Sequence, residues 1–477
     1  MKNHLLNPSD CSSNVSNAKE QPPVFVFKSI RLNPGITQTN FVCSLLFSVI
    51  SAFGMGGTAG LQLLILLDPS YYNVSQDNAG SINSMILIIQ SLVGMATGIP
   101  YGHLVDTIGR KMLVVIGSFS FLAGCLLLPL QTSVFPGFVL AFILITNGSA
   151  AFSSLPLMAD YVAEESRGKA FAIAGVILSF AILIPNLLVK GLLYADVSLG
   201  VCYYIFGIIT FVGLLINNFG LRKGTYRLEK PEDAQKTSQH SQQSFLDRMK
   251  EAYQIFKNNN WLKISLVIQA LAASDFMILM SFLALYVKSL YPGEASATEG
   301  NTAVNNLQTL ITLTMLVSMP FFGYILDKKN IFLQLCLLSL GGGITSLILF
   351  SLTTQPSSFT LYLGAFVFDS TLPGLGTILN LITFKHYPAE KRGIMVGFAQ
   401  LVTNCSYFIL AIGGGVLYDH WRTGPFVVSA GLLAFTIVII LILFKRIPPE
   451  SSHVSEKVEV DLEVLDSGKS GRYKQLH

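Results

Sequence analysis

Charged residues are scarce in this chain. Asp, Glu, Lys and Arg make up 12% of its 477 residues, whereas soluble domains usually contain about 25%. Hydrophobic residues make up 51%. They form continuous runs of about 20 residues, which is long enough to cross a bilayer as a helix. The runs do not alternate between apolar and polar residues, which argues against a transmembrane barrel. We therefore predict an all-α membrane protein.

The signatures of catalytic and metal sites are also missing from the sequence. We find no phosphate-binding loop, nucleophile triad, metal-ligand cluster or nucleic-acid patch. The six cysteines lie in the first 38 residues or inside apolar runs, so no two share an external loop that a disulfide could close. We predict that the protein is not an enzyme and that it has no cofactor, no metal and no nucleic-acid partner.

The apolar runs predict twelve spans in two halves of six. They lie at 40–67, 80–101, 112–130, 137–160, 168–190, 198–221, 262–286, 304–326, 331–353, 358–384, 393–418 and 424–444. The predicted regions are a disordered tail (1–38), an N-terminal half (39–221), a central loop (222–260), a C-terminal half (261–444) and a second tail (445–477). The first tail lacks the apolar core of a signal peptide, so the first span is expected to act as the insertion signal. In the central loop, Phe245–Phe256 has helical apolar spacing, which fits an amphipathic helix on the membrane surface or a plain linker helix.

Lys and Arg predict the orientation of these spans. The side that holds both tails carries 28 of the 31 basic residues, and the other side carries 3. Because cytoplasmic loops are rich in Lys and Arg, both tails are expected in the cytoplasm. Asn73, in an Asn-Val-Ser sequence on the outer side, is then a candidate glycosylation site.

A short charged turn separates the second and third spans. Asp106 and Arg110 are four residues apart and can pair on a helical turn. Gly102 and Gly109 permit a sharp turn and close packing, and Lys111 follows Arg110. A polar connector that carries the charges needed for topology would look the same. The pattern Gly-x-x-x-Asp-x-x-Gly-Arg-Lys, however, resembles the signature loop of the major facilitator superfamily.

The second half repeats parts of the first. Gly323-Tyr-Ile-Leu-Asp327-Lys-Lys occupies the equivalent turn between the eighth and ninth spans, but it lacks the second Gly-Arg. Arg167 after the fourth span has a counterpart in Arg392 after the tenth. Such internal symmetry is typical of a transporter built from two related halves. The resemblance therefore extends over about residues 40–444.

The resemblance implies alternating access by two rocking halves. The substrate site would lie between them at mid-membrane, chiefly on the first, fourth, seventh and tenth spans. Asp106 and Arg110 would belong to a cytoplasmic charge clamp, and Arg167 and Arg392 to similar latches. The fifth span has Pro185 but few of the glycines that are usual in antiporters of the family, so this span does not support antiport.

Two carboxylates lie deep in predicted spans, Asp275 in the seventh and Asp369 in the tenth. An Asp at a helix centre costs roughly 2.5–3.5 kcal/mol on insertion scales, so we expect each to bind a proton or substrate. A structural hydrogen bond to a neighbouring helix is the alternative, and Gln269 is a candidate partner of Asp275. Pro373 cannot donate to the carbonyl four residues earlier, which leaves the carbonyl of Asp369 free for a ligand, for Ser370 or for water.

Asp369-Ser-Thr-Leu-Pro373 is similar to the tenth helix of vesicular amine transporters, although the first span carries Gln62 rather than an acid. No Lys or Arg lies in the middle of a predicted span, which disfavours a strongly anionic substrate. Four other polar side chains in predicted spans could contact the substrate, or they could form hydrogen bonds that only hold neighbouring helices together. These residues are Thr146, Asn147, Gln400 and Asn404.

The favoured interpretation is a secondary active transporter of a small neutral or cationic organic solute, coupled to protons and embedded in a lipid bilayer. A facilitative uniporter, for example of sugars, and a non-transporting receptor or sorting partner on the same fold are the alternatives. Tyr473–Leu476 resembles a tyrosine-based sorting signal for a sorting adaptor. The expected location is the plasma membrane or an endolysosomal membrane.

Overall fold

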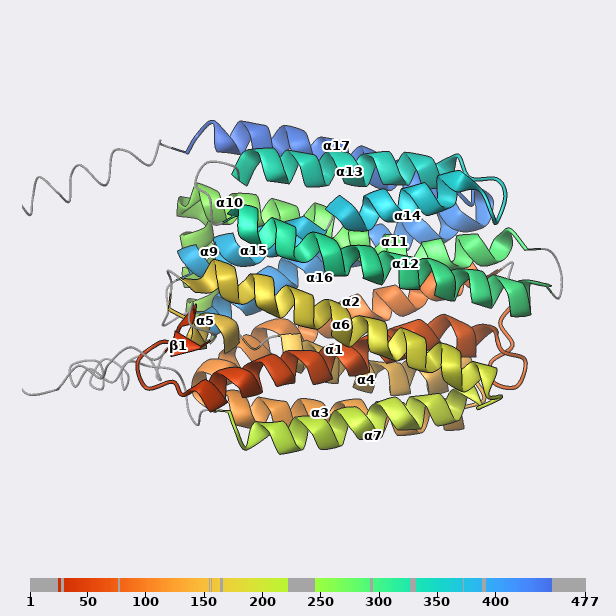
Figure 1. The fold of residues 1–477 in the computed structure, drawn as a ribbon, viewed down its shortest axis with the longest axis horizontal. Helices are drawn as coiled ribbons and strands as arrows, with labels where there is room; N and C mark the ends of the chain where they lie inside the picture. The colour runs from red at the N-terminus through yellow and green to blue at the C-terminus, as the bar shows by residue number, and fades with distance from the viewer. Residues whose placement is uncertain are drawn as a thin grey trace, which may run out of the picture.

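The computed structural model of the protein is a bundle of long helices that run along one axis (Figure 1). It describes residues 25–26, 30–75, 78–153, 155, 157–163, 166–221, 245–291, 295–326, 332–371, 373–387 and 392–447. Asp327, Tyr473–Leu476 and most of both predicted tails lie outside these ranges. α1 begins and α17 ends at one end of the bundle, which we call the tail end, and the opposite end is the far end (Figure 1).

The N-terminal half is built from helices that enclose an aromatic core. Thr37 and Asn40 form a capping box that starts the first helix. Phe41, Phe121 and Phe206 are fully buried among these helices. The helices are α1 (Gln38–Leu67), α2 (Ala79–Thr107), α3 (Arg110–Leu127), α4 (Val139–Ser153), α5 (Leu157–Tyr161), α6 (Arg167–Tyr194) and α7 (Leu199–Asn218), with the short elements η3 (Leu128–Leu130) and η4 (Val134–Phe138).

The C-terminal half has its own core around Phe282, Phe350 and Phe426. Its helices are α9 (Phe245–Asn258), α10 (Asn260–Val267), η6 (Ile268–Ala273), α11 (Ser274–Ser289), α12 (Ala295–Leu326), α13 (Phe332–Ser351), α14 (Phe359–Thr371), α15 (Pro373–His386), α16 (Arg392–His420) and α17 (Gly424–Phe444). The all-α fold predicted from the sequence is confirmed.

Nine helical segments of the described chain are long and apolar enough to span a membrane. Two further passages are interrupted: 260–289 is divided by the π-helix η6, and 359–386 is broken before Pro373. α12 is a continuous helix of 32 residues. The count of twelve spans therefore stays a prediction.

The helix predicted in the central loop is α9, and its apolar face packs on protein. Ala252 and Phe256 are 1% and 2% exposed. The Phe256 ring meets those of Tyr387 and Phe398 at centroid distances of 5.8 and 5.1 Å. α9 therefore covers the tail end of the C-terminal half.

The segment before α1 contains strands that the sequence interpretation did not expect. β1 (Phe25–Val26) pairs antiparallel with β2 (Ile30–Arg31), and Leu32 continues the strand by bridging to Val162. Ile30, Leu32 and Ile36 are buried. The predicted disorder up to residue 38 is therefore wrong for residues 30–36, because these apolar side chains find a core to enter.

The two halves touch along α2 and α16, which run antiparallel. A Cβ at Gly102 would collide with the carbonyl oxygen of Gly393, and a Cβ at Gly397 would lie 2.7 Å from the carbonyl oxygen of Gly98. Small residues thus let the two backbones approach closely. We call these tail-end contacts of Gly98 and Gly102 with Gly393 and Gly397 the glycine seam.

Candidate functional site

A cavity of about 460 Å³ lies between the two halves, alongside the glycine seam. It falls within the usual size range of small-molecule sites, about 300–1,000 Å³. Helices of both halves contribute to its wall. The lining residues are Met55, Gln90, Gly94, Gly98, Thr146, Ser149, Ala150, Ser153, Gln269, Ala272, Met315, Met319, Leu375, Gly376, Leu379, Gln400, Thr403, Asn404 and Tyr407.

The lining is uncharged wherever the structure describes its side chains. Residues with carboxamide side chains line the cavity from both halves, Gln90 from α2 and Gln269, Gln400 and Asn404 from the C-terminal half. Carboxamides donate and accept hydrogen bonds without carrying charge. The rest of the wall is largely apolar and includes methionines, which adapt readily to irregular ligand shapes. The cavity is therefore suited to a solute with both polar and apolar faces.

Four of the polar residues singled out in the sequence reach this cavity, Thr146, Gln269, Gln400 and Asn404. Gln400 also donates from Nε2 to Ser153 Oγ at 3.3 Å, which links α16 to α4 across the two halves. The first, fourth, seventh and tenth predicted spans all contribute, as expected. In addition α2 and α16 supply three and four lining residues, because close packing brings these helices to the wall.

Asn147 and Gln62 occupy other positions. Asn147 Oδ1 accepts a hydrogen bond from the Tyr101 hydroxyl at 2.6 Å, and its Nδ2 donates to Ser120 Oγ at 3.0 Å. These bonds join α4 to α2 and α3, which is the helix-joining alternative considered for Asn147. Gln62 is half-buried on α1 and is not among the lining residues.

Asp369 lies behind the cavity wall rather than on it. The residue is 1% exposed, and both carboxylate oxygens lack a hydrogen-bond partner among the described residues. Its main-chain oxygen accepts a hydrogen bond from Ser318 Oγ of α12 at 2.9 Å. Met315 and Met319 line the cavity on either side of Ser318 along α12. Asp369 itself is not among the lining residues, so the cavity and this residue are linked through α12.

The break that the sequence predicted after Asp369 is present, since α14 ends at Thr371 and α15 begins at Pro373. The carbonyl that Pro373 cannot satisfy is the one that Ser318 reaches. A hydroxyl from another helix therefore takes the place of the ligand, Ser370 or water considered from the sequence. Asp275 lies in the first turn of α11, and its side chain is outside the described residues.

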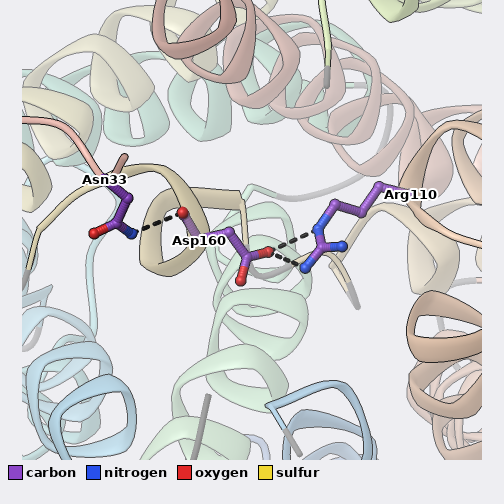
Figure 2. Close-up of polar contacts among 3 residues, drawn as sticks. All are labelled: Asn33, Arg110 and Asp160. Carbon is purple, nitrogen blue, oxygen red and sulfur yellow. Dashed lines mark hydrogen bonds and ion pairs between the residues drawn. The ribbon is translucent and has the colours of Figure 1, made fainter. Parts of the chain in front are cut away.

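The charged turn between α2 and α3 holds a buried ion pair at the tail end. Arg110 Nε donates to Asp160 Oδ2 at 2.7 Å, and a terminal guanidinium nitrogen of Arg110 reaches the same oxygen (Figure 2). The two side chains are 7% and 2% exposed. Gly109 before Arg110 has φ 85°, a conformation that only glycine adopts readily. Asp160, which the sequence interpretation missed, is thus a partner of Arg110; the side chain of Asp106 is outside the described residues.

The remaining predicted gating residues are distributed around the same end. Lys111 donates from Nζ to the carbonyl oxygen of Phe219 at 3.1 Å. Arg167 and Arg392 begin α6 and α16, and their side chains are not described. Asn73, the glycosylation candidate, is exposed at the far end with φ 48°.

Some residues of the cavity and of the ion pair could have been identified from the sequence by the same arguments that identified their neighbours. Gln90 is a carboxamide inside the second span, as Gln269 is in the seventh, and the same reasoning applies to both. Asp160 lies at the end of the predicted fourth span, on the same side of the membrane as the basic turn that contains Arg110. An acid at this position indicates an ion pair with that turn. Met315 and Met319 had no comparable signal, because methionine is common in apolar cores.

Comparisons with known proteins agree with this architecture. The family model of the Major Facilitator Superfamily matches residues 45–293 and 295–471. The inner membrane transport protein YajR of Escherichia coli K12 is 24% identical over 428 residues, covering 86% of this chain and 87% of the relative. The structure resembles the proton:xylose symporter XylE (TM-score 0.62, 13% identity, covering 86% of this chain and 95% of XylE) and the human organic anion transporter MFSD10 (TM-score 0.56, 13% identity, 84% and 99%).

Proposed function

The chain belongs to the major facilitator superfamily and is a multi-pass membrane transporter, and from that premise we propose what it carries and how. It moves a small neutral or cationic organic solute by alternating access of its two halves. Transport is coupled to protons. The observation that carries this proposal is the uncharged cavity between the halves, together with the buried Asp369, whose main chain is bonded to the lining helix α12.

The lining of the cavity supports the choice of solute. A strongly anionic solute needs a basic group that replaces its hydration, and among the described lining residues there is none. Neutral groups of a solute can bond to the four carboxamides. An ammonium group can use carboxamide oxygens and the aromatic ring of Tyr407, which is also a lining residue.

The burial of Asp369 supports proton coupling. An ionised carboxylate without a partner is very costly in a low-dielectric interior, so the group is neutral, and therefore protonated, in this conformation. Release of the proton requires water to reach the carboxyl group. Movement of α12 away from α14 in another conformation would admit that water, and the proton would then leave on one side of the membrane.

A facilitative uniporter is the second candidate. The observation that favours it is that Asp369 does not line the cavity, so the solute and the carboxyl group make no direct contact in this conformation. In a uniporter the protonated Asp369 would have only a structural role. The third alternative, a receptor or sorting partner without transport, predicts that no solute crosses the membrane at all.

The test is transport by the purified full-length protein in liposomes under an imposed pH gradient. A panel of neutral, cationic and anionic solutes would be screened by proton flux, with Asp369→Asn as the variant and the exposed Asp196→Asn as the matched control. We expect flux that requires both a neutral or cationic solute and Asp369. Solute movement that ignores the gradient and the Asp369→Asn change would establish a uniporter. Preference for anions would overturn the proposed substrate class.

We also propose that the tail end faces the cytoplasm, as the basic residues indicate. Asn73 would then lie outside the cell or in an organelle lumen and could carry a glycan. Treatment of the expressed protein with a glycosidase, compared with the Asn73→Gln variant, tests this orientation. Identical gel mobility of treated and untreated wild-type protein would contradict glycosylation, and labelling of exposed cysteines from each side would then decide the orientation.

A further inference from the structure

Residues 30–36 form a strap that is bonded to the chain after α4. The backbone N–H of Asn33 donates to the carbonyl oxygen of Tyr161 at 3.0 Å, and that of Ala163 donates to the carbonyl oxygen of Arg31 at 2.9 Å. The Arg31 N–H donates to Ser166 Oγ at 3.1 Å. Together with the bridge between Leu32 and Val162, these bonds add a strand to an otherwise irregular connection.

Burial anchors this N-terminal strap as well. Ile30, Leu32 and Ile36 are 0%, 3% and 1% exposed, and they share a core with Tyr161 and Val162. Removal of three apolar side chains of this size from solvent stabilises the attachment of the strap. The strap is therefore held by side chains and backbone together, and it is part of the folded N-terminal half.

The strap is connected to the ion pair at the tail end. Asn33 Nδ2 donates to the main-chain oxygen of Asp160 at 2.8 Å, while the Asp160 carboxylate accepts from Arg110 (Figure 2). Arg110 begins α3 directly after the turn that ends α2. The last turns of α2 carry Gly102, which packs on Gly393 in the glycine seam. A continuous series of contacts thus runs from the strap to the place where the halves meet.

The C-terminal half has an equivalent arrangement. α9 precedes that half as the strap precedes the first, and Phe256 of α9 packs on Tyr387, which follows α15. In both halves, therefore, the segment before the first span is anchored on the connection that follows the fourth. The repetition indicates that the anchoring has a role beyond closing one loop.

We propose that the N-terminal strap restrains the tail end of the transporter in its closed state. It holds Asp160 against Arg110 and so keeps the end of α2 in the position that seals the glycine seam. Release of the strap shifts the conformational equilibrium toward states open at the tail end. This inference goes beyond the proposed function, since it requires neither a particular solute nor proton coupling.

The test measures access to the cavity from each end. Ala150, a lining residue of α4, is changed to Cys in the full-length protein. Three other cysteines are first changed to Ser: Cys11, which lies outside the described residues, and Cys43 and Cys405, which are the described cysteines that are not buried. A membrane-impermeant maleimide is added to one side of proteoliposomes of known orientation. Asn33→Pro removes both hydrogen bonds that Asn33 donates, and Ser166→Ala removes the acceptor of the Arg31 N–H.

We expect Asn33→Pro to raise labelling from the tail side by about fivefold or more, the factor that corresponds to one net hydrogen bond, and to lower labelling from the far side. Ser166→Ala should give a smaller change in the same direction. Thr39→Ala, an exposed position on α1, should behave like the parent.

Two results would overturn the proposal. One is unchanged labelling in both strap variants, and the other is an equal rise from both sides, which would indicate general loosening. If Asn33→Pro does not fold, as judged by size-exclusion chromatography, the outcome for Ser166→Ala decides. Failure of the proposed function can be distinguished from failure of this inference. In that case solute flux would be absent, while the strap variants would still raise labelling from the tail side and lower it from the far side.

Discussion

Asp419 of α16 caps the first turn of α2 from the opposite half of the molecule. Its Oδ2 accepts hydrogen bonds from the backbone N–H of Ser81 at 3.1 Å and from the Ser81 hydroxyl. Asn78, the N-cap residue of α2 itself, makes no side-chain capping bond. A negative carboxylate at a helix N-terminus also interacts favourably with the helix dipole. At the far end of the bundle, the two halves are thus joined by a helix cap that one half supplies to the other.

Replacement of Asp419 by Ala should favour states open at the far end. Loss of an N-cap costs about 0.5–2 kcal/mol, and here the cost falls only on the closed arrangement. Labelling of Ala150→Cys from the far side should therefore rise by roughly 2- to 30-fold. Asp196→Asn, an exposed change at the same end, serves as the control. An unchanged rate in Asp419→Ala would mean that the cap does not limit opening.

Gly102→Ala should destabilise the closed tail end. The new methyl group would meet the backbone of Gly393, which cannot move aside as a side chain can. Overpacking of this kind costs typically about 1–3 kcal/mol. A methyl group added at Gly191 of α6 would have no atom of the described structure within 4 Å, so Gly191→Ala should be neutral or slightly stabilising. Thermal unfolding of both variants in detergent, with equal midpoints, would contradict the importance of the glycine seam.

A double-mutant cycle should reveal strong coupling between Arg110 and Asp160. Removal of one partner of a buried ion pair leaves an uncompensated charge and costs about 3–5 kcal/mol. The double variant Arg110→Ala with Asp160→Ala should therefore be less destabilised than the sum of the two single variants. The measurement is denaturant unfolding in mixed micelles. Additive effects would show that the two side chains act independently.

Ser318→Ala should destabilise the junction between α14 and α15. The change removes the hydroxyl that satisfies the buried main-chain oxygen of Asp369, at an expected cost of about 1–3 kcal/mol. Ser370→Ala is the matched control, because the Ser370 hydroxyl donates to the carbonyl oxygen of Phe366 in its own helix, its one hydrogen bond within the described structure. This change should alter stability by less than about 0.5 kcal/mol. Similar unfolding midpoints for the two variants would argue against a special role for Ser318.

Features that depend on local sequence could be predicted. The turn at Gly109, the break at Pro373 and the helical nature of both halves follow from glycine, proline and long apolar runs. The lack of a basic residue in the described cavity lining also follows, because the predicted spans contain no Lys or Arg at mid-depth.

Features that depend on the approach of distant segments could not be predicted. The bond between Asn33 and Asp160 joins residues 127 positions apart, and nothing in either local sequence indicates the other. The rotation of α14 about its own axis could not be predicted from the sequence either. Its residues from Leu361 to Phe368 are apolar apart from Tyr362, so no polar face shows which side meets the cavity, and Asp369 is not among the lining residues.

The uncharged lining also has an electrical consequence. Moving one elementary charge through a membrane voltage of 100 mV changes its energy by about 2.3 kcal/mol. Under the proposed proton coupling, Asp369 is neutral in the loaded carrier, so a carrier loaded with an uncharged solute presents no described charge in its cavity for the voltage to act on. The voltage would act instead on the return of the empty carrier with Asp369 ionised. Transport currents would then depend on voltage because the return of the empty carrier depends on voltage. At a saturating solute concentration, this return would be the step that limits the current.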